Sequence, residues 1–436
     1  MTTPIPFSEA FLHYIWQFKL FDFKDLKTVD GESIELIRVG RQNDHAGPDF
    51  SDARIRIGGT LWAGSVEIHK KSSDWLVHQH QKDKAYKNTI LHVVYEHDQS
   101  IYRADGTTVP TLILKNKIPN QYIKRYWALK TNQQSIPCEQ QFFEVSIHLK
   151  KMWLDRLVVE RLEDKTAEII TCLEQTQYNW EVVFYQFLAR NFGMKQNTSA
   201  FEALAQSLPL MVLAKHKQDL FQLEALLFGQ AGFLFELNGE EVEDKYLQKL
   251  EKEYQYLAHK YELIALNASS WKFGRMRPAN FPTIRLAQFA VLIHQSSHLF
   301  SKILATQHVV DCKKLFHLEL NGYWDTHYRL GESSSHRKKR LGSKTIDLIL
   351  INTIAPFLFV YGVYKGEDRY KKRALELLQL VKPEVNMVVA QWQNLGMKPH
   401  SAYDTQGLIQ LKNKYCRAKR CLSCAIGHKI LQRSSS

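Results

Sequence analysis

The first helix expected from the sequence lies near the start of the chain. Between residues 7 and 18 apolar side chains recur at intervals of three and four positions, and Ser8 precedes them as a suitable N-cap. The apolar stripe consists of Phe11, Leu12, Ile15, Trp16 and Leu20. A helix with one apolar stripe must bury it against another element, so we expect this helix to cover a sheet.

After this helix the period of the apolar positions shortens to two, which is typical of strands. Within Ala53–Ile57, alanine and isoleucine alternate with Arg54 and Arg56, so the apolar and basic side chains face opposite sides. Gly58-Gly59 then predicts a hairpin turn. The expected strands are Ile34–Val39, Ala53–Ile57, Thr60–His69 and Thr89–Tyr95, with a further hairpin or edge strand within Tyr102–Leu114.

A second helix is expected over Trp75–Lys87, with Asp74 as its cap. The three strands before it are close enough in sequence to form a meander. Thr89–Tyr95 is almost wholly apolar, as is typical of a central strand buried on both faces, and we expect it to run parallel to one of the first three strands. The N-terminal region is therefore predicted to be an α/β domain with a mixed sheet flanked by helices.

From about residue 142 the pattern changes to long helical periodicity. The most apolar stretch, Ile346–Tyr364, contains Asp347 and Pro356, which are costly at membrane depth. We interpret it as a buried helix pair broken before Pro356 and not as a membrane span. The sequence thus predicts an α/β domain at residues 1–135 followed by a mainly α-helical domain at residues 136–436.

Charge adds an expectation about partners. The 436 residues carry a formal net charge of +13 with an ordinary hydrophobic content of 44%, which favours a polyanionic partner and above all nucleic acid. A solvated basic surface is the alternative. The N-terminal sequence lacks the charged and apolar segments of a secretory signal, and six cysteines without an export signal indicate a reducing compartment. We therefore expect a cytoplasmic protein without membrane contact.

The residues with the clearest chemistry lie between His45 and Lys71. Asp49 follows Gly47-Pro48 at the start of one strand, and Glu67 and His69 share a face near the end of the next. A hairpin can bring the two carboxylates together, and such a pair repels unless a cation lies between them. Oxygen ligands of this kind suit Mg²⁺ or Mn²⁺. The alternatives are a turn residue for Asp49 and an exposed strand carboxylate for Glu67.

These residues resemble the motif of the PD-(D/E)XK nuclease superfamily. Pro48-Asp49 matches the first half of the motif, and Glu67-Ile68-His69 matches the second half, with histidine in place of lysine. The expected order of helix, three strands, helix and strand is also similar to the restriction-endonuclease-like core of that superfamily. This resemblance covers roughly residues 7–115. The whole chain is also similar to an uncharacterised bacterial family of unknown function.

The resemblance implies a metal-dependent nuclease that hydrolyses phosphodiester bonds in DNA or RNA. Asp49, Glu67 and the Ile68 carbonyl would bind the metal ion, and His69 would position the attacking water. Because histidine replaces the lysine of active members, a catalytically inactive module that binds nucleic acid or protein is the alternative. Lys70 is the obvious substitute, but a regular strand turns it to the opposite face. A metal-dependent hydrolase of another substrate, using the histidines from His69 to His97, is a third hypothesis.

Other residues are expected to support this site. Glu9 on the first helix corresponds to acidic residues that face the metal in some relatives, and His45 lies on the same loop as Asp49. The second helix carries Asp83 and Tyr86 on one face, together with His78 and His80. A solvated helix face is the alternative for each of these. We interpret His92, within an apolar strand, as a core histidine.

A second group of metal-ligating residues lies near the C-terminus. Cys416, Cys421 and Cys424 are followed by His428, and Cys138 is a candidate for a further ligand. Three thiolates and one more ligand can hold zinc or an iron–sulfur cluster. The alternative is that Cys421, Cys424 and His428 share one helix face, where reduced cysteines pack as small apolar residues.

Overall fold

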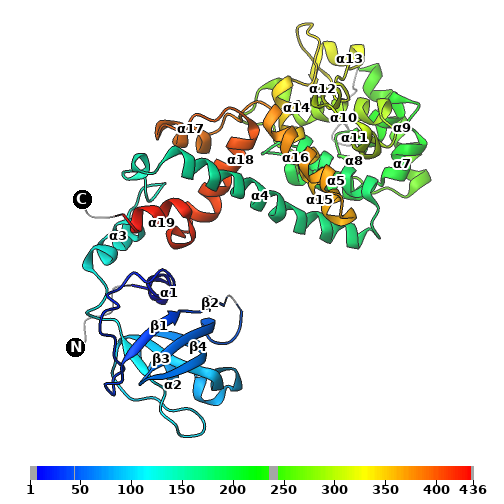
Figure 1. Ribbon diagram of the computed structural model, residues 1–436. Helices are drawn as coiled ribbons and strands as arrows, with labels where there is room; N and C mark the ends of the chain where they lie inside the picture. The colour runs from blue at the N-terminus through cyan, green and yellow to red at the C-terminus, as the bar shows by residue number, and fades with distance from the viewer. Residues whose placement is uncertain (1–6, 44, 235–243, 434–436) are drawn as a thin grey trace. The chain divides into compact units, whose positions relative to one another are not determined.

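The computed structural model describes residues 7–43, 45–234 and 244–433. They group into two compact units. The first consists of the described residues of Met1–Trp153 together with those of Leu411–Ser436, and the second is Leu154–Gln410. The C-terminal segment therefore groups with the α/β region, whereas the sequence-based division placed all residues after 135 in one helical domain. In Figure 1 the strands of the α/β region are blue to cyan, and the C-terminal segment is red.

The first unit is built on a mixed sheet whose strands follow the order β1-β3-β4-β5-β6, with β2 paired to β3. The first three strands along this path are antiparallel, and β5 and β6 run parallel to β4 and β5 respectively. The predicted meander followed by a parallel strand is thus confirmed, and Figure 1 labels strands β1 to β4 of this sheet. The strands are β1 (Ile34–Arg38), β2 (Arg41–Gln42), β3 (Phe50–Ile57), β4 (Thr60–Lys71), β5 (Thr89–Glu96) and β6 (Thr111–Ile113).

The alternation of apolar and polar residues sets the faces of this sheet. In β3 the side chains of Ala53, Ile55 and Ile57 are buried, whereas Arg54 and Arg56 are exposed. Helix α1 (Glu9–Gln17) packs against β4 with its buried apolar stripe, as the sequence predicted. At the end of this helix the Trp16 indole Nε1–H donates to the Val39 carbonyl at 3.0 Å. The helix is therefore fixed over the sheet, and its polar side chains are held in a defined direction.

The second predicted helix is broken into three short pieces, so that prediction was wrong. They are α2 (Asp74–Val77) and the 3₁₀ turns η1 (His80–Lys82) and η2 (Lys84–Asn88). Gln79 adopts a left-handed conformation with φ 59°, which ends α2. Asp83 is extended and its carboxylate accepts from the Ala85 N–H, which starts the next turn. This irregular path directs His78 and His80 differently from a continuous helix.

Further helical elements complete the first unit. After the sheet come α3 (Asn120–Thr131), η3 (Phe142–Glu144) and the start of α4 (Ile147–Gln175). The C-terminal segment adds the π-helix η7 (Leu411–Cys416), the 3₁₀ turn η8 (Cys421–Ser423) and α19 (Ala425–Leu431). The Arg125 guanidinium on α3 donates to the Leu431 carbonyl at 3.1 Å, which fastens α19 to α3.

The second unit is helical apart from a small two-stranded sheet, as expected from the periodicity. Its core contains stacked and edge-to-face aromatic rings such as Phe184 and Phe357, whose centroids are 5.2 Å apart. The remaining part of α4 leads into α5 (Trp180–Phe192), α6 (Thr198–Ser207), α7 (Leu210–Lys215), α8 (Leu220–Gln230), α9 (Lys245–Tyr261), η4 (Ala268–Ser270), η5 (Pro278–Asn280), α10 (Pro282–Gln295), α11 (Leu299–Ala305), α12 (Val309–Lys314), α13 (Gly322–Asp325), β7 (His327–Arg329), β8 (Glu332–Ser333), α14 (Ser343–Ile349), η6 (Leu350–Ile354), α15 (Ala355–Lys365), α16 (Asp368–Leu380), α17 (Met387–Asn394) and α18 (Ala402–Gln410).

The apolar stretch near residue 350 forms one long helix and not the broken pair that the sequence predicted. Between α14 and α15 the segment Leu350–Ile354 is a π-helix, and Pro356 occupies the first turn of α15. The wider π turn removes the clash between a proline ring and the carbonyl four residues earlier, so the helix continues. By length and composition Ser343–Lys365 could cross a membrane, but 72% of its most apolar window is buried inside the protein.

Gly64 gives a direct test of how closely β4 and β5 must approach. A Cβ atom at this position would lie 2.5 Å from both the Asn88 carbonyl oxygen and the Ile90 Cγ2. We expect Gly64→Ala to destabilise the first unit by about 1 to 3 kcal/mol, because the strands must separate. Differential scanning calorimetry measures this effect. Gly274→Ala is the control, since nothing lies within 4 Å of its Cβ position; equal stability of the two variants would contradict the prediction.

Candidate metal centre

Two reciprocal hydrogen bonds join Asp49 and Glu67. The Asp49 backbone N–H donates to Glu67 Oε2 at 3.0 Å, and the Ile68 backbone N–H donates to Asp49 Oδ2 at 2.9 Å. Asp49 immediately precedes β3, and Glu67 lies in the neighbouring antiparallel strand β4, where Phe50 pairs with Val66. The strand register therefore brings the two carboxyl groups together. This proximity was expected from the sequence, because two carboxylates that share an ion must lie close to each other.

The second oxygen of Glu67 faces histidine side chains. Glu67 Oε1 lies 3.2 Å from His80 Nε2 and 3.5 Å from His69 Nε2. Burial raises the pKa of the Glu67 carboxyl group, and the nearby Asp49 carboxylate raises it further, whereas the hydrogen bond with His80 lowers it. A buried carboxylate in such surroundings is stabilised by any cation that the adjacent imidazoles can help to bind.

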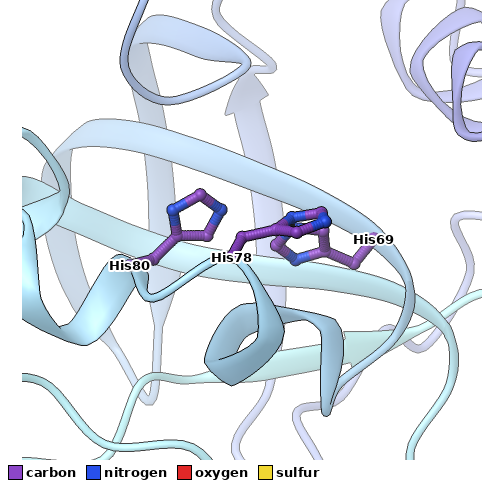
Figure 2. A group of neighbouring side chains, drawn as sticks. All are labelled: His69, His78 and His80. Carbon is purple, nitrogen blue, oxygen red and sulfur yellow. The ribbon is translucent and has the colours of Figure 1, made fainter.

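Three histidines form a compact group beside Glu67. One ring nitrogen from each of His69, His78 and His80 lies within 4.8 Å of the others. His69 comes from β4, His78 follows α2, and His80 begins η1, so the left-handed turn at Gln79 brings the last two into the group. Figure 2 shows the three imidazole rings gathered in one place. This is a geometry in which nitrogen ligands can share one metal ion.

His92 on β5 fixes the orientation of His69. His69 Nδ1 lies 2.8 Å from His92 Nε2, while His69 Nε2 lies 3.0 Å from His78 Nδ1. A metal ion on Nε2 of His69 would leave the proton on Nδ1, where it donates to His92. Burial and the neighbouring imidazoles lower the pKa of His69 to about 2 and that of His92 to about 3. Both rings are therefore neutral, which is the form that binds metals.

Helix α1 contributes two further polar side chains. His13 Nε2 lies 3.2 Å from Asp49 Oδ2. Burial alone would lower the pKa of His13, but the hydrogen bond and charge of Asp49, with the charges of Glu9 and Glu67, raise it overall. Glu9 lies one helical turn earlier, and its pKa is raised to about 7 mainly by burial. Asp49 and Glu67 also act on Glu9 through their charges, which places Glu9 at the same centre.

Aromatic rings form the base of the histidine group. The His80 ring stacks on Tyr86 with centroids 3.8 Å apart, and the Trp75 ring meets His80 edge-on at 5.3 Å. Tyr86 and Trp75 are both buried. Because stacked rings resist rotation, they hold His80 with its nitrogen toward Glu67.

The structure brings most of the predicted site residues together. Asp49, Glu67 and His69 converge, and Glu9 and Tyr86 lie beside them. His45 is exposed, with its backbone N–H bonded to Asn43. The Asp83 carboxylate caps a turn, and Lys70 alternates to the opposite face of β4 because the register is regular from Val66 onward.

His13 was missed by sequence analysis, and the link from His92 to His69 was not foreseen. The spacing of Glu9 and His13 was a usable signal, since residues four apart on a helix share a face. His92 was interpreted as a core histidine; it is fully buried, but it also hydrogen bonds to His69.

The second predicted group of ligands lies in the same unit. Cys138, Cys416, Cys421 and Cys424 are close enough that their charges would act on one another. His428 instead hydrogen bonds to the Tyr14 hydroxyl at 3.1 Å and packs edge-on against Phe18. The imidazole is thus engaged with α1.

The ligand chemistry of the carboxylate and histidine site is mixed. Asp49 and Glu67 each use one oxygen for a backbone N–H and keep a second oxygen for a cation. Carboxylates suit Mg²⁺ and Mn²⁺, whereas imidazoles suit zinc and other transition metals. The residues that the structure brings together include both kinds of ligand.

Comparison with known families gives one match. The family model described as "Protein of unknown function (DUF2851)" matches residues 9–387. The matched range includes α1, the whole sheet and all residues of the carboxylate and histidine site. No curated protein and no solved structure matches the chain.

Metal affinity tests the histidine group directly. We expect the chain to bind one Mn²⁺ or Zn²⁺ ion at this site, and His78→Ala or His80→Ala to weaken binding by about 10- to 100-fold. His78 is exposed, so its replacement removes a ligand at little cost in stability. Isothermal titration calorimetry measures the affinities, with the exposed His45→Ala as a control. Unchanged affinity in both variants would exclude these imidazoles as ligands.

Proposed function

We propose that the chain, which belongs to the DUF2851 family, is a metal-dependent nuclease that hydrolyses phosphodiester bonds in DNA or RNA. The observation that carries this proposal is the convergence of Asp49 and Glu67 with three imidazoles at one end of the sheet. The resemblance of Pro48-Asp49 and Glu67-Ile68-His69 to the PD-(D/E)XK motif supports it, because these are the residues that meet. The net charge of +13 favours a polyanionic substrate.

Each group at the site has its own role in the proposed hydrolysis. When bound, a divalent cation polarises a phosphoryl oxygen and acidifies a coordinated water. Asp49 and Glu67 would hold that ion, and their hydrogen bonds with backbone N–H groups keep the carboxylates from turning away. His13 lies against Asp49, where its imidazole can face the substrate from α1.

A cavity that His80 shares with neighbouring basic side chains offers room for part of a substrate, although His80 is the one residue of the carboxylate and histidine site that lines it. It measures about 330 Å³ and is lined by Trp75, His80 and Tyr86 together with the basic residues Lys82, Lys84, Lys87 and Arg103. Asp83 and Asp105 also line it. The Arg103 guanidinium donates to the Thr108 and Thr89 carbonyls, both at 2.8 Å, so it serves the fold. The exposed lysines are therefore the groups that can contact phosphates.

A second candidate function is binding of nucleic acid or protein without catalysis. It is favoured by His69, which stands where active members of the resembled superfamily have lysine. Both ring nitrogens of His69 lie within hydrogen-bond distance of other imidazoles, which leaves no nitrogen for a water molecule unless His78 moves. The rate at which the chain cleaves nucleic acid distinguishes the two candidates, because a binding protein without catalysis cleaves none.

Isosteric replacement of the carboxylates tests the nuclease proposal. Asp49→Asn and Glu67→Gln keep an oxygen that accepts the backbone N–H, so the strands stay paired. We expect each to lower cleavage by at least about 100-fold, since a lost metal interaction is worth several kcal/mol. The assay uses the full chain with Mn²⁺, Mg²⁺ or Zn²⁺ and labelled single- and double-stranded DNA and RNA.

Asp52→Asn is the matched control for these variants. Asp52 is an exposed carboxylate on the same strand, and it has a left-handed φ of 57° that asparagine tolerates. Its cleavage rate should equal that of the unmodified chain. Binding of nucleic acid without cleavage under every metal ion would favour the second candidate. A lack of both binding and cleavage would defeat the nuclease proposal and leave only protein binding from the second candidate.

The lysines of the cavity should contribute to nucleic-acid affinity. For Lys84→Ala combined with Lys87→Ala we expect weaker binding of duplex DNA and a salt dependence whose slope falls by about 0.9 for each lost phosphate contact. Fluorescence anisotropy at several salt concentrations measures both quantities. Lys24→Ala combined with Lys27→Ala removes the same charge from exposed positions that do not line the cavity. Equal slopes for the two double variants would contradict a role of the cavity.

A further inference from the structure

Four cysteine thiols converge in the first unit from two distant parts of the chain. Cys138 lies in the turn after α3, Cys416 ends η7, Cys421 begins η8, and Cys424 precedes α19. All four are free thiols, and all but Cys421 are buried. The first is separated from the others by the whole of the second unit, so their meeting is not a consequence of local sequence.

Polar contacts hold the two segments in register around these thiols. The Lys412 ammonium group donates to the backbone carbonyl and the hydroxyl of Ser135, three residues before Cys138. The Lys419 ammonium group donates to the Lys130 carbonyl at 2.8 Å. These two lysines flank Cys416 in sequence, so the fold positions that thiol opposite the turn of Cys138.

Close packing adds a second constraint. A Cβ atom at position 427 would lie 2.2 Å from the Cys421 carbonyl oxygen, so Gly427 allows α19 to contact the backbone of η8 directly. The Trp153 ring meets the ring of Tyr415, the residue before Cys416, edge-on at 5.3 Å. These contacts therefore fix the backbone of the segment that carries Cys416, Cys421 and Cys424.

The surroundings of the thiols include one another and backbone N–H groups. Burial raises the pKa of Cys138 to about 12 and that of Cys421 to about 11, and the neighbouring thiols raise both further. The backbone N–H groups of Gly427 and Ile426 hydrogen bond to Cys424 and lower its pKa, in opposition to burial. Hydrogen bonds from N–H groups to sulfur favour thiolates, and they are a means by which proteins tune sulfur-ligated metals.

We propose that these cysteines ligate an iron–sulfur cluster that fastens the C-terminal segment to the α/β region. The ligands are Cys138, Cys416, Cys421 and Cys424. Four thiolates are the ligand set of such clusters and also of structural zinc. This inference does not depend on nuclease activity, because it concerns a separate set of residues.

The spacing of the sulfur atoms favours the cluster over zinc. A single zinc ion with Zn–S bonds of about 2.3 Å draws its four sulfurs to within about 4 Å of one another. Among the described residues, only the histidine group has three ligand atoms within 4.8 Å, so the thiols are more widely spread. A cluster places iron and sulfide between the cysteines and suits wider spacing. His428 is not part of the set, since its ring faces Tyr14 and Phe18.

Binding of the cluster would link the two chain segments that make up the first unit. Each thiol would lose its proton on becoming a ligand. Once formed, the centre joins residue 138 to the segment that begins at Leu411. The unit would then depend on the cluster for stability, as small metal-bound domains do.

Metal analysis of the full chain tests this proposal. Protein purified without oxygen, or reconstituted with ferrous iron, ferric iron and sulfide, should contain about two to four iron atoms and matching sulfide, with visible absorption. Cys421→Ser, at the one half-buried position, should lose most of the iron. Cys312→Ser is the matched control, because Cys312 is a buried thiol in the second unit, and this variant should retain the iron.

A second measurement covers the case in which the variant does not fold. Removal of iron from the unmodified chain by a chelator should lower the unfolding temperature, and reconstitution should restore it. Zinc in place of iron at the same cysteines would overturn the iron–sulfur assignment. No metal in any preparation, or equal iron loss in Cys312→Ser, would overturn the site itself and leave four buried thiols that pack as small apolar side chains.

Discussion

The candidate metal centre depends on the reciprocal pair of hydrogen bonds between Asp49 and Glu67. Each carboxylate accepts the N–H at or beside the other residue, so neither side chain can turn without breaking a bond in a partly buried site. A charge-assisted bond of this kind contributes about 1.5 to 3 kcal/mol. The pairing of β3 with β4 and the packing of α1 against β4 serve to keep this register.

Much of the α/β fold could be predicted from the sequence because its signals are local. The alternation in β3, the apolar run of β5 and the capped stripe of α1 each follow from the period of one element. The same holds for Asp49 and Glu67, since a hairpin between adjacent strands fixes their separation. The mixed sheet and the convergence of the predicted carboxylates with His69 could therefore be inferred before the structure was known.

The histidine group could not be inferred in this way, because it depends on a departure from periodicity. In a continuous helix His78 and His80 would point about 200° apart, since successive residues turn by about 100°. The left-handed conformation of Gln79 breaks the helix between them and directs both rings toward His69. Nothing in the glutamine side chain signals such a conformation. The grouping of Cys138 with the C-terminal segment is likewise a long-range contact, which no local pattern reports.

The charges at the centre distinguish a ligand set from a structural ion-pair network. A buried network that serves stability pairs each carboxylate with a lysine or arginine, since an unpaired buried charge is costly. Around Glu67 the described contacts are instead with imidazoles, and burial keeps His69 and His92 neutral. Glu67 and Glu9 both have raised pKa values, so the acidic groups are not balanced by the protein alone. Beside Glu67, the neutral His69 is a poor counter-ion and a good ligand, whereas His13, whose pKa is raised, is the imidazole paired with Asp49. The arrangement lowers its free energy when a divalent cation enters, and this is why we interpret it as a functional site.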